Sequence, residues 1–446
     1  MKCVFSRITA AILISGLVGA CSPSPDAAQE AGSVRVLAPL SNSKGSYSLD
    51  IFELKGIEDL QTMTGKFVRF FMSPRIVNNH LEGSAPKTRF IRNSDGDYIP
   101  GNEMTQQLVT LYAHMQKLAL LDEELGAGGI NSWPRDVGVA VRAKGGVNNN
   151  AFYDGATDSM LFVPYTQDGL PIAINGGILA HEHFHSLFYK TVLNDGTAEV
   201  HSRKDFLNRI LMEDLSARER KLLPVATEAE LTDEQMHFYY HLAFTRGLNE
   251  GLADFWGWMY TGDPDFIAQS LPSEKSFRSL KVKDESSVNS LPSEDVIKRA
   301  LKVYYSTGNK QRFVDYVTGY AYSLGTQFSR VLKRYTDIYA KAHGVEALQA
   351  RKDTAKIIVK VLPQLKEDFL AVGNKYYAST DFVNAVIAKM QVTQDMKEEE
   401  CQFFSEVLNN SKSDSTVKYS CKKDSGWSIE ATVEGTTPPA GESSSK

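Results

Sequence analysis

The sequence predicts an α+β protein in which a β-rich amino-terminal part is followed by a mostly helical part. Two observations lead to this fold class. Short β-prone runs separated by turn residues fill residues 34–102, and beyond Pro171 most of the chain, to about Met390, carries apolar residues at helical spacing. The chain has 446 residues, which is enough for two or three domains.

The β-prone runs and the helical stretches can be placed in order along the chain. We expect strands over residues 34–40, 65–72, 88–101, 136–143, 151–153 and 158–165. A long helix over residues 103–125 lies among them and is ended by the glycine-rich sequence Gly-Ala-Gly-Gly at residues 126–129. Further helices are expected over residues 172–193, 204–215, 233–260, 294–305, 315–343 and 354–372.

The composition is that of an ordinary globular protein. Apolar residues make up 42% of the chain and charged residues 23%. With 49 basic and 54 acidic side chains the formal net charge is -5, so the chain lacks the basic surplus that favours a polyanionic ligand. We therefore expect no nucleic-acid partner.

The amino terminus has the pattern of an export signal. Lys2 and Arg7 precede an apolar stretch over residues 8–18, which is shorter than the roughly 20 residues of a membrane-spanning helix. Small residues at 19–20 then lead to Cys21, and this segment resembles the lipobox of bacterial lipoproteins. The resemblance implies lipidation of Cys21 and a membrane-anchored place in the bacterial cell envelope. A residue other than Asp after Cys21, here Ser22, resembles the sorting signal for the outer membrane, and the inner membrane is the alternative. The alternative is a plain secretory signal that leaves Cys21 as a free thiol.

The residues that carry chemistry are His181 to His185, which read H-E-x-x-H within an apolar helical stretch. Four residues are about one turn of a helix, so His181 and His185 lie on the same face and can bind one ion. Glu182 is one step further round, where it can reach a metal-bound water without becoming a ligand. A motif this short also occurs by chance, so a third ligand on another element has to support it.

The helical stretch over residues 233–260 supplies that third ligand. Glu250 and Asp254 share one face of it. We expect Glu250 to bind the metal and Asp254 to accept a hydrogen bond from the outer ring nitrogen of a ligand histidine. Gly247 and Gly251 would let this helix approach the first one closely. The alternative is a solvated acidic pair on an amphipathic helix.

At these residues the chain resembles the gluzincin metallopeptidases, the clan that includes thermolysin, neprilysin and the zinc aminopeptidases. Their signature is H-E-x-x-H followed by E-x-x-x-D or a close variant. The resemblance implies one Zn²⁺ per chain, held by His181, His185 and Glu250. It also implies that Glu182 is the catalytic base and that Asp254 supports a ligand histidine. The gap between the two motifs is longer than in thermolysin and looks more like that of neprilysin.

Two weaker similarities flank the signature. Asn150 and Ala151 lie in a segment that resembles the edge strand with which thermolysin-like enzymes hold the substrate backbone, and such an edge can accept an extended peptide. The alternative is a turn into a strand. Tyr322 resembles the catalytic tyrosine of the zinc aminopeptidases, and a phenol there can donate a hydrogen bond to the oxyanion. Tyr320 is a rival for this role, and aromatic residues in a helix are usually part of the core.

Other histidines are expected to have structural roles. His237 and His241 are also four residues apart, but no glutamate follows the first of them. His183 faces away from His181 and His185, and we expect it in the core or behind the ligands.

Two cysteines, Cys401 and Cys421, are left when the signal segment and Cys21 are set aside. In an oxidising compartment we expect a disulfide between them, with two free thiols as the alternative. The chain then divides into a signal peptide (1–20), a flexible tether (21–33), a β-rich region (34–102), a metallopeptidase catalytic domain (103–395), a carboxyl-terminal segment (396–431) and a disordered tail (432–446).

Together these features predict zinc-dependent hydrolysis of peptide bonds outside the cytoplasm, with peptides or proteins as substrates. We expect endopeptidase activity, because the G-x-M-E-N segment with which aminopeptidases of this clan bind a free amine is not in the sequence. Two alternatives stay open. One is a zinc-stabilised binding lipoprotein without turnover, and the other is an amidase or peptidase that acts on cell-wall peptides.

Overall fold

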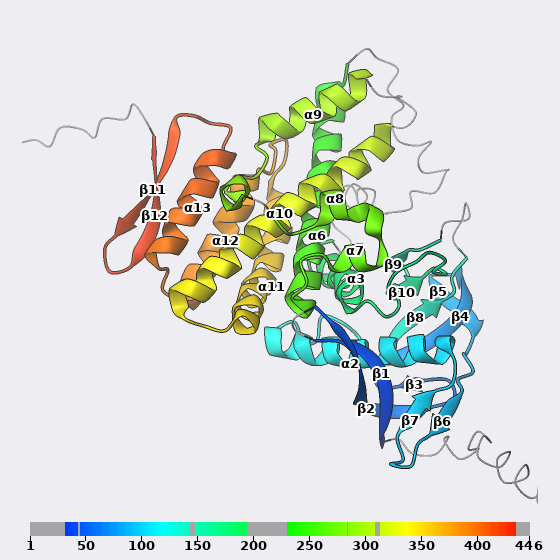
Figure 1. Cartoon of the computed structure of the whole chain (residues 1–446). Coiled ribbons are helices and arrows are strands. Elements are labelled where there is room, and N and C mark those ends of the chain that lie inside the picture. Colours follow the sequence, from blue (N-terminus) through cyan, green and yellow to red (C-terminus); the bar gives the residue numbers. More distant parts are fainter. Residues whose placement is uncertain are drawn as a thin grey trace, which may run out of the picture. The chain divides into compact units, whose positions relative to one another are not determined.

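The computed structural model describes residues 32–42, 45–142, 148–193, 230–282, 284–307 and 313–433 (Figure 1). They form a mixed α/β protein with sheets in the amino-terminal part and helices in the rest, as the sequence predicts. Two compact units comprise Met1–Leu121 with Ser132–Leu179, and Asp122–Asn131 with Ala180–Lys446. The division falls within the helices α2 (Glu103–Leu125) and α3 (Gly176–Phe188), whereas the sequence suggested a boundary before residue 103.

The first unit contains two five-stranded sheets. Their strand orders are β3-β2-β1-β7-β6 and β5-β4-β8-β10-β9. In the second sheet β4, β8 and β10 run parallel, and β5 and β9 are antiparallel edge strands. The strands are β1 (Gly32–Ser41), β2 (Tyr47–Asp59), β3 (Thr64–Gly65), β4 (Val68–Val77), β5 (His80–Ser84), β6 (Phe90–Arg92), β7 (Tyr98–Pro100), β8 (Arg135–Val139), β9 (Ala151–Asp154) and β10 (Ser159–Phe162). The sequence analysis did not predict β2 and β5.

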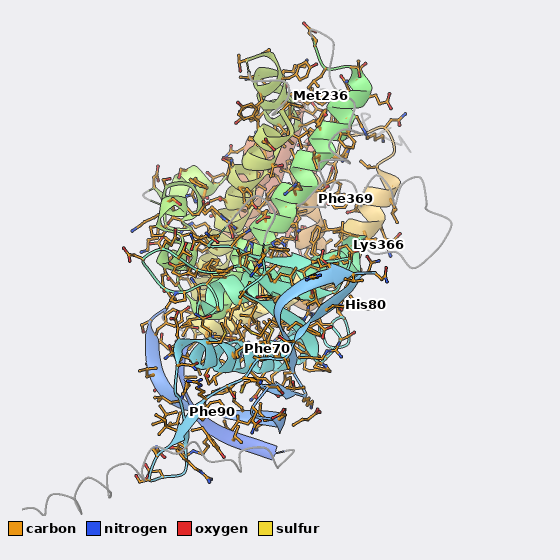
Figure 2. The ribbon with its side chains drawn as sticks, turned by 90° about the vertical axis from the view of Figure 1, so that its right-hand side faces the viewer. Phe70, His80, Phe90, Met236, Lys366 and Phe369 are labelled. Carbon is orange, nitrogen blue, oxygen red and sulfur yellow. A yellow bond between two sulfur atoms is a disulfide. The ribbon has the colours of Figure 1, made fainter. Side chains whose placement is uncertain are left out.

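Alternate residues of the strands form the core of the first unit together with α2, which is buried on all sides over residues 108–116. Val36 and Ala38 on β1 have no exposed surface, and Phe70 on β4 is 2% exposed (Figure 2). Helix α2 is fixed to the edge of β2, because Tyr112 Oη lies 2.9 Å from the carbonyl oxygen of Lys55. The predicted bounds of this helix match the observed ones.

The first turn of α3 is closely packed. Oδ1 of Asn175 accepts a hydrogen bond from the backbone N–H of Gly177 at 3.0 Å and so caps the helix. A Cβ on Gly176 would lie 2.6 Å from Cε1 of His114 on α2, so a larger residue would push the two helices apart. The helix predicted over residues 172–193 therefore begins at Gly176, and its last turn is the π-helix η3 (Tyr189–Leu193).

The second unit is built around α6 (Asp233–Thr261) and α10 (Phe313–His343). Thr232 closes a capping box at the start of α6, and Gly262 ends the helix in a left-handed conformation. A Cβ on Gly251 of α6 would lie 2.3 Å from the carbonyl oxygen of Gly325 on α10, so the two backbones touch there. The shorter elements around them are α7 (Phe266–Ser270), η5 (Pro272–Glu274), α8 (Lys275–Arg278), η6 (Glu285–Val288) and α9 (Glu294–Thr307).

The carboxyl-terminal part of the second unit is more ordered than the sequence suggested. Helices α11 (Ala347–Ala371), α12 (Ser379–Thr393) and α13 (Glu398–Ser411) are followed by a hairpin of β11 (Val417–Lys423) and β12 (Trp427–Val433). Figure 1 shows this hairpin, in red, beside α13. A disulfide joins Cys401 on α13 to Cys421 on β11. Helix α11 starts before residue 354. Most of α12 lies in the region expected to be helical to about Met390, although no bounds were predicted for it, and α13 and the hairpin were not predicted.

Several predicted segments fall outside the described residues. These are the signal segment with Cys21, most of the tether, the helix over residues 204–215 and residues 434–446. Strand β1 begins at Gly32, within the predicted tether, and β12 includes the first two residues of the predicted tail.

The contact between α6 and α10 gives a matched pair of substitutions in one helix. A Cβ on Gly325 would lie 2.6 Å from the carbonyl oxygen of Gly247 and 3.1 Å from Cβ of Glu250, whereas none of the described atoms lies within 4 Å of a Cβ on Gly319. We expect Gly325→Ala to lower the free energy of unfolding by about 1–3 kcal/mol. Gly319→Ala should raise it by up to about 1 kcal/mol. Urea unfolding measures both, and equal effects would contradict this packing.

His114 makes the stability of the chain depend on pH in the acid range. Burial, followed by the charge of Lys117, lowers the pKa of His114 to about 3. The unfolded chain takes up a proton on this ring near pH 6.5, so the stability that the neutral ring contributes is present above that pH and is lost as the pH falls towards 3. Between pH 7 and pH 5, the free energy of unfolding should fall by about 2 kcal/mol less in His114→Gln than in the wild type, as measured by urea unfolding. The control is His80→Gln, because His80 is exposed.

Candidate metal centre

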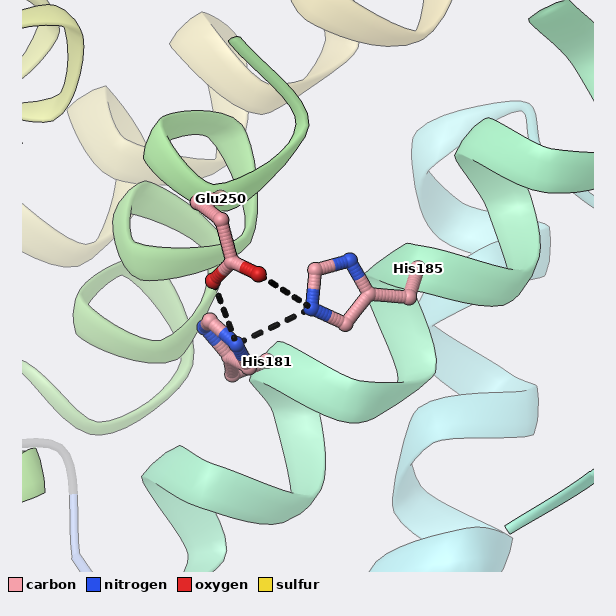
Figure 3. A group of neighbouring side chains, drawn as sticks. All are labelled: His181, His185 and Glu250. Carbon is pink, nitrogen blue, oxygen red and sulfur yellow. Dashed lines mark hydrogen bonds and ion pairs between the residues drawn. The ribbon is translucent and has the colours of Figure 1, made fainter. Parts of the chain in front are cut away.

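Three side chains from two helices converge in the second unit (Figure 3). His181 and His185 lie one turn apart on α3, and their Nε2 atoms are 3.0 Å apart. Glu250 of α6 faces them, with Oε2 3.5 Å from Nε2 of His181 and Oε1 3.9 Å from Nε2 of His185. The three residues are buried, and their ligand atoms lie within 4.8 Å of one another, so the group could bind a metal ion.

Each histidine of this group has an acceptor behind its ring. Nδ1 of His185 donates a hydrogen bond to Oδ1 of Asn249 at 3.0 Å, and Nδ1 of His181 lies 3.0 Å from Oδ1 of Asp254. Because an amide oxygen only accepts, Nδ1 of His185 carries the hydrogen and the Nε2 atom of that ring presents a lone pair. This is the tautomer that a metal ligand needs.

The charges of the group favour a cation. Burial lowers the pKa of His185 to about 4, so its ring is neutral at pH 7. At His181 burial also lowers the pKa, but hydrogen bonds to Asp254 and Glu250 outweigh it and raise the value to about 10. Burial opposes ionisation of Glu250, yet His181 and His185 hold the pKa of that carboxyl well below its usual range. The proton between the two Nε2 atoms therefore belongs to His181, and a metal ion has to displace it.

Arg278 on α8 completes the charge balance. Its Nη2 lies 2.6 Å from Oδ1 of Asp254 and 3.4 Å from Oε2 of Glu250, and its Nε lies 3.3 Å from Oδ2 of Asp254. The guanidinium also lies over the ring of Tyr322, 4.9 Å from its centroid. One arginine thus links both carboxylates of α6 to a tyrosine of α10.

The predicted base and tyrosine are both near the group. Glu182 follows His181 on α3 and is 6% exposed. Its negative charge is among the influences that raise the pKa of His181. Tyr322 adjoins the group through Arg278, whereas the ring of Tyr320 packs against Tyr304 on α9, with centroids 5.6 Å apart. Of the two tyrosines, Tyr322 is therefore the one beside the group of His181, His185 and Glu250.

The predicted substrate-binding segment belongs to the other unit. Ala151 is the first residue of β9, an edge strand of the second sheet that pairs with β10. The carbonyl oxygen of Asn150 accepts a hydrogen bond from the N–H of Val163 at 2.9 Å. The segment is thus an edge strand in the first unit, while the three possible ligands lie in the second.

The remaining histidines have partners of their own. Nε2 of His183 lies 2.8 Å from Oδ1 of Asp122, which ties α3 to the last turn of α2. Nε2 of His237 and Nε2 of His241 each lie 3.1 Å from the carbonyl oxygen of Lys375. These contacts agree with the structural roles expected for them.

Sequence reasoning missed two residues of the site. Asn249 directly precedes the predicted ligand Glu250, and this position beside a motif residue was the sequence signal for it. Arg278 stands 24 residues after Asp254 in a segment without a recognisable motif. The one signal for it is indirect, since two buried carboxylates on one helix face require a cation.

The chain matches no protein-family model and no curated protein. Among the described residues, no helix combines the length and the apolar character that crossing a membrane requires.

Metal binding can be tested by comparing the two histidine pairs. We expect the wild-type chain to retain one Zn²⁺ after dialysis. His185→Ala removes a ligand, so it should lower the affinity by more than the roughly 10- to 100-fold typical of changing a residue that only hydrogen-bonds to a ligand. His237→Ala should keep the wild-type stoichiometry, because His237 contacts a neutral carbonyl. Mass spectrometry of the bound metal gives the answer. Retention of Zn²⁺ by His185→Ala would show that the ion binds elsewhere.

Proposed function

We propose that the protein is a zinc-dependent peptidase of the gluzincin type that hydrolyses peptide bonds outside the cytoplasm, as an endopeptidase. The observation that carries the proposal is the orientation of the two histidines. Both rings have an acceptor at Nδ1, and both Nε2 atoms converge with the carboxylate of Glu250. Such an arrangement is typical of a catalytic zinc site with three protein ligands.

The donor set suits Zn²⁺ among the common metal ions. Two imidazole nitrogens and one carboxylate are borderline-soft ligands, whereas Mg²⁺ and Ca²⁺ prefer sites made of oxygen atoms. His181, His185 and Glu250 would hold the ion. When bound, zinc polarises a carbonyl group and lowers the pKa of a water molecule towards about 7.

The residues around these ligands have the roles that peptide hydrolysis needs. Glu182 takes a proton from the attacking water and returns it to the departing amine. Tyr322 donates a hydrogen bond to the carbonyl oxygen as negative charge develops on it. Asp254 and Asn249 hold the imidazole rings in place, and Arg278 compensates the charge of Asp254.

The location and the substrate class rest on the sequence and on one strand. The lipobox-like segment before Cys21 supports a lipid-anchored protein of the bacterial cell envelope, at the outer membrane. The position of β9 as an edge strand of the second sheet supports peptides as ligands, because an extended chain can pair with an edge strand. Asn150 and Ala151 are the residues proposed for this contact.

Glu182→Gln separates metal binding from catalysis. The change keeps the size of the side chain but removes the base, so we expect Zn²⁺ to be retained while kcat falls by roughly 10²–10⁴-fold. Cleavage of casein and of quenched peptides by the chain from residue 22 measures this, with the exposed Glu399→Gln as control. If both the wild type and Glu182→Gln bind zinc and neither cleaves, a binding protein or a narrowly specific cell-wall hydrolase replaces the proposal.

The two tyrosines of α10 provide a second matched comparison. Tyr322→Phe should lower kcat by about 10²-fold with a smaller change in KM, because its hydroxyl acts on charge that develops in the transition state. Tyr320→Phe should leave both constants within about twofold, since its ring packs against Tyr304. Steady-state kinetics on one peptide compares the two. A larger loss in Tyr320→Phe would reverse the assignment.

A further inference from the structure

The outer face of the first sheet carries a row of aliphatic side chains. In β1 the buried residues alternate with Leu37 and Pro39, which therefore point to the opposite face. Leu37 pairs with Ile51 and Pro39 with Leu49 across the antiparallel contact between β1 and β2. The row thus covers two neighbouring strands.

The same row continues across the next two strands. Val36 of β1 pairs with Tyr98 of β7, so the following residue, Ile99, points to the same face as Leu37. Ile99 in turn pairs with Ile91 of β6. We call these six residues the aliphatic face; they are Leu37, Pro39, Leu49, Ile51, Ile91 and Ile99.

Much of the aliphatic face is exposed. Leu49 is 59% exposed, Ile51 40% and Ile91 54%, and the other three residues are partly buried. Single exposed apolar residues are common, but a contiguous group on four adjacent strands marks an interaction surface. The six residues are aliphatic, and the next pair on the same face is Arg35 with Glu53, long side chains whose charged ends can reach a polar headgroup layer.

We propose that the aliphatic face rests on the lipid bilayer in which the chain is anchored. This inference depends on the proposed lipidation of Cys21. Residues 22–31 alone separate Cys21 from the first strand of this sheet, and they span at most about 40 Å when extended. The aliphatic face therefore belongs to the sheet whose first strand directly follows the anchored segment.

The anchor strengthens a contact that is weak by itself. The tether that the sequence predicts over these residues would have an end-to-end distance of about 18 Å, which corresponds to an effective concentration in the millimolar range. A few aliphatic side chains bind a bilayer weakly from solution, but such a tether keeps them at the surface. The contact would hold the first sheet flat on the membrane and so fix the orientation of the first unit.

The test uses the chain from residue 21 with Cys21→Ala, so that no lipid contributes. Sedimentation with vesicles of phosphatidylethanolamine and phosphatidylglycerol (about 3:1) gives the bound fraction. The combined change Leu49→Ser, Ile51→Ser and Ile91→Ser should lower the partition coefficient at least about tenfold, because binding scales with the apolar area inserted. The matched control changes three exposed aliphatic residues on other elements: Ile76→Ser, Val303→Ser and Val392→Ser.

A second measurement locates the contact. An environment-sensitive fluorophore on Leu49→Cys should shift to shorter wavelength when vesicles are added, whereas the same fluorophore on Ile76→Cys should not. Equal partitioning of the wild type and the triple variant, or no partitioning of the wild type, overturns the proposal. A fluorophore on Leu49→Cys that responds to protein concentration instead of lipid, with a dimer seen by light scattering, also overturns it and makes a second copy the occupant.

The anchor and the activity are measured separately. The mass of the peptide that contains residue 21, from bacteria that express the whole chain, reports lipidation. Cleavage of a soluble peptide by the triple variant should equal that of the wild type, since the changed residues lie in the first unit and the proposed ligands in the second. Failure of the anchor, of the peptidase or of the sheet contact thus gives three different results.

Discussion

Two buried carboxylates on one face of α6 determine much of the arrangement of the second unit. Glu250 is 4% exposed and Asp254 1% exposed, and burying such charges without partners would cost several kcal/mol each. Arg278 pairs with both of them, and His181 lies between them. Arg278 and the proton on His181 balance these two negative charges, so an ion that displaces the proton meets one negative charge that Arg278 does not balance. The charge balance of these buried groups therefore suits the site to a divalent ion, independently of any resemblance to known enzymes.

The local part of this site could be predicted from the sequence, because it depends on helix geometry alone. The spacing of His181 and His185 places both rings on one face, and the spacing of Glu250 and Asp254 does the same on the second helix. The contact of Arg278 with Asp254 could not be predicted in this way. It depends on how a four-residue helix packs against α6, and no periodic pattern encodes such a contact.

The same distinction holds for the fold. Helix α2 was predicted to its ends because an uninterrupted apolar pattern stops at a run of glycines. Strand β2 was missed, since exposed residues dominate its first half and Gly56 interrupts it. Helix α13 begins with three glutamates in a charged stretch, yet Phe404 and Leu408 are buried at helical spacing. The helical spacing of these apolar residues was overlooked because charged residues dominate the composition of the stretch.

The two histidine pairs show why spacing alone does not define a metal site. Both pairs are four residues apart on a helix, and in both the Nε2 atoms point at one group. For His237 and His241 that group is the carbonyl of Lys375, which is neutral and is satisfied by two N–H donors. For the pair on α3 it is the carboxylate of Glu250, and oxygen atoms of Asn249 and Asp254 lie 3.0 Å from Nδ1 of the two rings. The third group and the partners at Nδ1 thus decide whether such a pair forms a clamp between helix and loop or a site for a cation.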